Sequence, residues 1–184
     1  MNCPQCRGYQ LEPKEIESGL VGAVCPKCEG ALLSLMNYRF WNDRNALDVK
    51  TINSEVEVEE IHQEAVDNSS ALACPKCSRF MSKFNIGSSS SNRIDLCTGC
   101  DEAWLDKGEW RLLKQLDLHG KLPKIFTDAW QRNIRLKRQE QHLDDRYEAL
   151  LGVDDFAKVT EFKQWLAQHS KATEIRHFLN VKFD

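Results

Sequence analysis

Cys74-Pro75-Lys76-Cys77 and Cys97-Thr98-Gly99-Cys100 are two Cys-x2-Cys pairs separated by 19 residues. The N-terminal stretch repeats this arrangement with Cys3-Pro4-Gln5-Cys6 and Cys25-Pro26-Lys27-Cys28, separated by 18 residues. All eight cysteines of the chain belong to these four pairs. One cysteine module therefore occurs twice, with one residue inserted in the second copy.

Each module carries the ligand set of a structural zinc site. Zinc prefers four ligands in a tetrahedron, and each Cys-x2-Cys turn supplies two sulfurs from one side. We therefore predict two zinc ions per chain. Iron in a rubredoxin-like site is the chemical alternative, because Cys-Pro-x-Cys knuckles also hold iron. The predicted metal ligands are Cys3, Cys6, Cys25, Cys28, Cys74, Cys77, Cys97 and Cys100.

A zinc ion with four cysteine ligands has no open position for water or substrate, so such a site is of the structural type. Glycine-rich phosphate loops, nucleophile elbows and paired-carboxylate motifs are missing from the sequence. The sequence therefore predicts no catalytic or cofactor-binding residues and a protein that is not an enzyme. The histidines are too scattered to suggest a ligand set; they are His62, His119, His142, His169 and His177.

The charge of the chain argues against general binding to nucleic acid. Its formal net charge is −3 over 184 residues. Each zinc tetrathiolate has a formal charge of −2, because the metal binds deprotonated sulfur. Two filled sites would take the formal charge from −3 to −7. Proteins that bind the phosphate backbone are normally basic.

Nothing in the sequence predicts a membrane span or a secretory signal. A transmembrane helix needs a run of about 18 or more apolar residues, and the chain has none. The N-terminus, Met1-Asn2-Cys3-Pro4, lacks the basic and apolar regions of a signal peptide. Paired cysteines in such a context favour metal over disulfides. We therefore expect a cytoplasmic protein.

The modules and their surroundings predict an α+β fold with short antiparallel hairpins. Gly19–Val24, Phe80–Ile86 and Arg93–Leu96 are β-prone segments between cysteine pairs. The aromatic run Tyr38–Trp41 predicts packing against a core. We expect a first zinc ribbon at 1–35, a connecting segment at 36–73, a second zinc ribbon at 74–106, and a helical region of about four helices at 107–184, packed with the ribbons.

The helical region shows start and stop signals. Asp106 is the predicted N-cap of a helix that Gly120 ends. A long helix is expected from about Lys124 to Leu151, with Gly152 after it. Two more helices follow, opened by Asp154 or Asp155 and by Ser170 in that order.

The second module resembles a known family. Cys74-Pro75-Lys76-Cys77, Met81, Cys97-Thr98-Gly99-Cys100 and Ala103–Glu109 are similar to the bacterial zinc-ribbon family named after transcription factor IIB (TFIIB-type). The similarity covers residues 74–116, and residues 1–35 match more weakly. Glu102 departs from the family pattern, which usually has glycine there. The resemblance implies zinc binding by the eight cysteines; it does not establish a role in transcription.

Trp104 has two readings within this motif. It could dock a partner, or it could cover the zinc knuckle while Asp106 and Glu109 cap the next helix. We favour the second reading.

The functional prediction is an interaction or adaptor protein with a protein partner. Five tryptophans and eight phenylalanines exceed what two small ribbons need for a core. A transcription-related or nucleic-acid-binding factor is the alternative, supported by Arg132, Arg135, Lys137 and Arg138. However, residues 121–184 hold 12 Lys and Arg against 10 Asp and Glu, so nucleic acid is disfavoured. A redox or metal-relay role would require iron or a labile zinc site.

Overall fold

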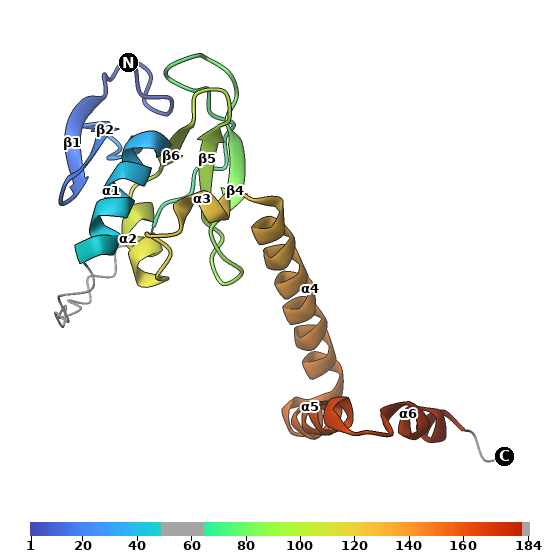
Figure 1. The fold of residues 1–184 in the computed structure, drawn as a ribbon. Coiled ribbons are helices and arrows are strands. Elements are labelled where there is room, and N and C mark those ends of the chain that lie inside the picture. Colours follow the sequence, from blue (N-terminus) through green and yellow to red (C-terminus); the bar gives the residue numbers. More distant parts are fainter. Residues whose placement is uncertain (49–64, 182–184) are drawn as a thin grey trace. The chain divides into compact units, whose positions relative to one another are not determined.

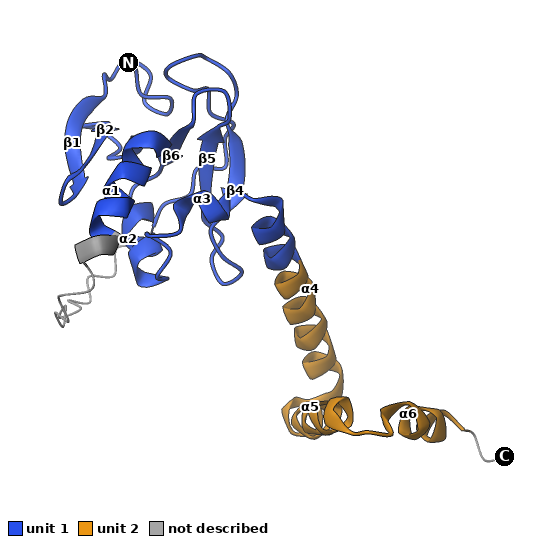
Figure 2. Ribbon diagram, in the orientation of Figure 1, with its two compact units in different colours: residues 1–135 blue, residues 136–184 orange. Residues whose placement is uncertain are grey.

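The computed structural model describes residues 1–48 and 65–181. They divide into two compact units, Met1–Arg135 and Leu136–Asp184 (Figure 2). The fold class is α+β as predicted, with a six-stranded antiparallel sheet in the first unit. Residues 49–64 of the predicted connecting segment, which include His62, lie outside the described residues.

Each cysteine module contributes three strands to one sheet. The first module provides β1 (Glu12–Glu17), β2 (Leu20–Val24) and β3 (Ala31–Ser34). The second provides β4 (Ser82–Asn85), β5 (Arg93–Cys97) and β6 (Glu102–Leu105). The strand order is β1-β2-β3-β6-β5-β4 (Figure 1). The predicted hairpins are confirmed as β1-β2 and β4-β5.

The two modules are joined by the pairing of β3 with β6, which places Leu32 opposite Trp104. Successive side chains on a strand point to opposite faces of a sheet. Leu33, Ala103 and Leu105 therefore pack into a helix-covered core, while Leu32 and Trp104 pack among the cysteines on the other face. Because both faces are covered, the middle of the sheet is buried throughout.

The helix-covered core contains the aromatic run predicted to pack. Tyr38 and Trp41 of α1 (Leu35–Asp48) are buried. They meet Trp110 of α2 (Glu109–Gln115), with ring centroids 6.5 and 5.6 Å from the Trp110 ring. The Tyr38 hydroxyl also accepts the Leu122 N–H at 3.1 Å, which fixes the start of α3 (Leu122–Ile125).

Two predicted helix boundaries in this unit are wrong. Gly108, not Asp106, is the N-cap of α2. Its φ of 85° is a conformation that glycine adopts without strain. The helix ends before Gly120, because Leu116 is already its C-cap and Asp117 turns the chain with a φ of 52°.

The predicted long helix is present with a later start, as α4 (Asp128–Leu151). Lys124, the predicted start, belongs instead to the separate short helix α3, which has Pro123 in its first turn. Gly152 ends α4 as predicted, and it is also the N-cap of the next helix, in place of Asp154 or Asp155.

The second unit contains the end of α4, then α5 (Val153–Gln168) and α6 (Ala172–Asn180). Lys171, not Ser170, is the N-cap of α6. Leu166 is the one buried hydrophobic side chain among the described residues of this unit. None of the helices in the described ranges combines the length and apolarity needed to cross a bilayer.

Candidate metal centres

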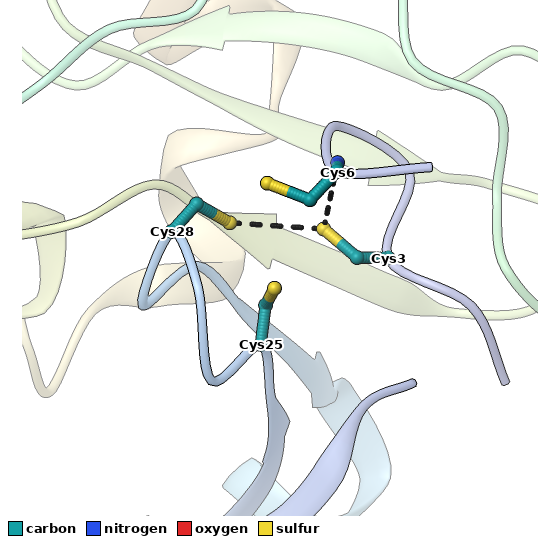
Figure 3. A group of neighbouring side chains, drawn as sticks. All are labelled: Cys3, Cys6, Cys25 and Cys28. Atoms are coloured by element: carbon teal, nitrogen blue, oxygen red, sulfur yellow. Dashed lines mark hydrogen bonds between the residues drawn. The ribbon is translucent and has the colours of Figure 1, made fainter. Parts of the chain in front are cut away.

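The first cysteine cluster is built from the N-terminal knuckle and the turn after β2. Cys3 and Cys6 approach Cys25 and Cys28 from the opposite side, and the four sulfurs converge (Figure 3). All four Sγ atoms lie within 4.8 Å of one another. Cys3 Sγ and Cys28 Sγ are 3.7 Å apart.

The second cluster repeats this arrangement with the knuckle that precedes β4 and the turn after β5. Cys74, Cys77, Cys97 and Cys100 also have all their Sγ atoms within 4.8 Å of one another. Cys77 Sγ lies 3.6 Å from Cys97 Sγ. The structure thus brings all eight predicted ligands together in two sets of four, and neither set mixes cysteines from the two modules.

The sulfur spacing fits a tetrahedral metal ion. A zinc ion with four sulfurs at about 2.3 Å has sulfur–sulfur separations of about 3.8 Å. The observed separations of 3.7 Å and 3.6 Å are close to this value. A disulfide requires about 2.05 Å, so these sulfurs are not bonded to each other. Each cluster could therefore hold one metal ion.

The backbone of the knuckles is shaped for thiolate ligands. The Cys6 N–H donates to Cys3 Sγ at 3.2 Å. After the other three knuckles, the chain turns through a residue with positive φ, namely Glu29, Ser78 and Asp101 at 59°, 61° and 56°. In each of these turns the N–H of that residue donates to the carbonyl of the first cysteine. The first knuckle differs, because its turn uses Gly8 at 96°.

Backbone hydrogen bonds and the crowding of sulfurs shift the pKa values of two thiols in the second cluster, Cys77 and Cys100, in opposite directions. Hydrogen bonding from the Arg79 N–H, together with its sulfur neighbours, lowers the pKa of Cys77 to about 7. The pKa of Cys100 is raised to about 12 by its hydrogen bond with Cys77, since two nearby thiolates repel each other. A divalent cation between the sulfurs removes this conflict and favours the thiolate at every position.

Trp104 joins the two ribbons beneath the clusters. Its side chain is fully buried and packs with cysteines of both sites. A Cβ atom added to Gly30 would lie only 2.4 Å from the Trp104 ring. The ring thus covers the knuckle of the first ribbon, although Trp104 belongs to the second. The sequence motif predicted that Trp104 covers the knuckle of its own ribbon, whereas the ring lies against Gly30 of the first ribbon, because β3 pairs with β6.

Asp106 has a different role from the predicted N-cap. Its Oδ1 accepts hydrogen bonds from Trp104 Nε1 at 2.8 Å and from Gln5 Nε2 at 2.6 Å. Its Oδ2 accepts the Asn68 N–H at 2.7 Å. The carboxylate therefore ties the Trp104 ring to the first knuckle and to the strand-free segment before Cys74. Sequence reasoning missed this role, because two of the three donors, Gln5 and Asn68, are distant in the chain.

Glu102, which departs from the family pattern, is buried in β6 and forms a salt bridge with Lys76 of the Cys74-Pro75-Lys76-Cys77 knuckle. This ion pair holds the knuckle against the sheet. Within the described ranges, the candidate metal clusters contain no histidine and no carboxylate.

The close fit between Gly30 and Trp104 gives a testable prediction. Gly30→Ala is expected to destabilise the first unit by about 1–3 kcal/mol, because the new methyl group overlaps the indole ring. Gly30 does not have a left-handed φ, so the cost is steric. Urea unfolding measures it. The control is Gly87→Ala, whose new Cβ meets no atom closer than 3.9 Å. Equal stability of the two variants would contradict the contact.

A second prediction concerns Glu109, which is fully buried. Burial, followed by the negative charges of Asp106 and Asp67, raises its pKa to about 9 from 4.5. The folded protein therefore holds this proton more tightly than the unfolded chain does. The stability that this proton on Glu109 contributes is fully present below pH 4.5 and is lost as the pH rises through 9.

Glu109→Gln removes this dependence and keeps an oxygen that can accept the Asp106 N–H. The variant is expected to match the natural protein near pH 5 and to exceed its unfolding free energy by roughly 1–3 kcal/mol at pH 8. Urea unfolding at both pH values, with the exposed substitution Glu161→Gln as control, measures the difference. A constant difference between the proteins at both pH values would show that Glu109 does not titrate as described.

Comparison of the chain with protein-family models, with curated proteins and with solved structures found no significant match.

Proposed function

We propose that the protein binds two structural zinc ions, one in each four-cysteine cluster. The observation that carries this proposal is the convergence of two sets of four sulfurs at separations close to those of a zinc tetrathiolate. Zinc would tie the knuckle before each hairpin to the turn after it. Each ribbon alone is too small to bury a sufficient core, which supports a stabilising role for the metal.

A non-enzymatic role is part of this proposal. Four cysteine ligands complete the coordination of zinc and leave no position for a substrate or an activated water. The buried polar groups near the clusters support the fold instead: Asp106 and Glu102 accept hydrogen bonds from the knuckles. The motif from Trp104 to Glu109 supports a relationship to the TFIIB-type ribbons, since Gly108 has a positive φ and Glu109 accepts the Asp106 N–H.

The protein is proposed to act in the cytoplasm as an interaction or adaptor protein. Exposed aromatic side chains support a protein partner. Phe80 is 79% exposed, and Tyr9 occupies the equivalent place after the first knuckle and is 42% exposed. On α1, Met36 and Phe40 are exposed one helical turn apart. Aromatic residues of this kind are enriched at protein interfaces.

The interaction role can be tested with the full zinc-loaded chain immobilised on a support. Proteins captured from a cytoplasmic extract are expected to be lost with Phe80→Ser or Phe40→Ser and kept with Val21→Ser, a similarly exposed position on β2. Capture that is insensitive to both aromatic substitutions would argue against these docking surfaces.

Nucleic-acid binding is the second candidate, favoured by the exposed side chains of Arg132, Arg135 and Lys137 on α4. Binding to phosphates would give retention on heparin that falls steeply with salt. We expect early elution with a shallow salt dependence, because acidic residues follow directly in the same helix. Steep retention that is lost in an Arg132→Glu, Arg135→Glu variant would instead support the nucleic-acid function.

A further inference from the structure

The C-terminal two-thirds of α4 carries an apolar stripe that the described part of the chain leaves about half exposed or more. From Leu136 to Leu151 none of its side chains is buried. Leu136, Leu143, Tyr147 and Leu150 are 52%, 47%, 47% and 73% exposed. Isolated helices of this length are marginal in water, and most gain their stability by packing an amphipathic face. This part of α4 therefore has the character of a helix that packs on another surface.

The spacing of the stripe is that of a coiled-coil seam. Leu136, Leu143 and Leu150 are seven residues apart, and Tyr147 lies four residues after Leu143 and three before Leu150. In heptad terms the leucines occupy d positions, while Glu140 and Tyr147 occupy a positions. The stripe is narrower than the face that a helix presents to a globular core. Such a seam fits a second helix of the same kind.

We propose that α4 pairs antiparallel with α4 of a second copy of this chain, through the seam formed by Leu136, Glu140, Leu143, Tyr147 and Leu150. In this register Leu136 of one copy lies against Tyr147 of the other, and Leu143 lies against Glu140. A polar residue at a single a position is a known device for fixing register. In this seam Glu140 is the polar residue at an a position.

The flanking charges select the antiparallel orientation. Lys137 and Asp144 both occupy e positions, and in an antiparallel pair e positions of one helix face e positions of the other. Lys137 of each copy then faces Asp144 of its partner, giving two attractive pairs. In a parallel pair, g positions face e positions of the next heptad, so Arg132 would face Lys137 and repel it. Charge complementarity therefore supports a second copy in the antiparallel arrangement.

The test measures the dissociation constant of the full-length, zinc-loaded protein by sedimentation equilibrium. Leu143→Asp is expected to weaken association by roughly a hundredfold or more, since it places a charge at the centre of the seam. Gln141→Asp adds the same charge on another face of the helix and is expected to leave association unchanged. Circular dichroism and metal content verify that both variants are folded.

Charge exchange distinguishes the orientations. Lys137→Asp and Asp144→Lys are each expected to weaken association by roughly tenfold, and the double variant is expected to restore it. A parallel pair predicts the opposite for Lys137→Asp, because the new carboxylate would then face Arg132 and strengthen binding. That result, or a natural protein that stays monomeric at high micromolar concentration, would overturn the proposal. Neither result bears on zinc binding or on the adaptor role.

Discussion

The Cys97→Ser variant is expected to bind one metal ion, where we propose that the natural protein binds two, and to unfold the second ribbon. Cys97 is buried at the end of β5, where its sulfur completes a set of four. Structural zinc contributes on the order of 10–16 kcal/mol in small domains. The total stability of a domain is typically only about 5–15 kcal/mol. Loss of this ion should therefore remove most of the stability of the sheet half formed by β4, β5 and β6.

Metal content per chain and tryptophan fluorescence during urea unfolding measure the two effects of this substitution. Thr98→Ser is the matched control, because it changes the neighbouring knuckle residue and leaves all four ligands in place. A Cys97→Ser variant that keeps two metal ions and the natural unfolding curve would show that the cluster is not a metal site.

Trp104→Ala is expected to destabilise the first unit by about 3–5 kcal/mol. The fully buried ring belongs to one cluster with cysteines of both sites and lies directly against Gly30. Its loss would leave a cavity where the two ribbons meet. The expected loss for Trp104→Phe is smaller, since phenylalanine keeps much of the volume and lacks the N–H that Asp106 accepts.

Urea unfolding of the two Trp104 variants provides the measurement, and Trp165→Ala, at a half-exposed position in the second unit, is the control. If Trp104→Ala had the same effect as Trp165→Ala, the two ribbons would not depend on Trp104 for their junction.

The ligand sets and the hairpins could be predicted from the sequence because both depend on local spacing. Two Cys-x2-Cys turns joined by a β-prone stretch can meet in few ways. The packing of the aromatic run could be predicted only in part: Tyr38 and Trp41, three residues apart on one helix face, are buried, while Phe40 between them is 64% exposed.

The union of the ribbons could not be predicted, because no local signal in β3 specifies β6 as its partner. Ala31–Ser34 is a short apolar run, and such a run fits many neighbours. For the same reason the predicted capping role of Asp106 was wrong. Its carboxylate instead accepts hydrogen bonds from Trp104 and from the distant Gln5 and Asn68, and a pattern of spacings along the chain does not reveal the two distant donors.

Elemental analysis of the full-length protein, purified without added metal, tests the central claim most directly. We predict two zinc ions per chain, and we predict that a strong chelator removes both and unfolds the sheet of the first unit. Iron in the clusters would contradict the assignment and favour electron transfer. A folded protein that contains no metal would contradict the structural role of both four-cysteine sites.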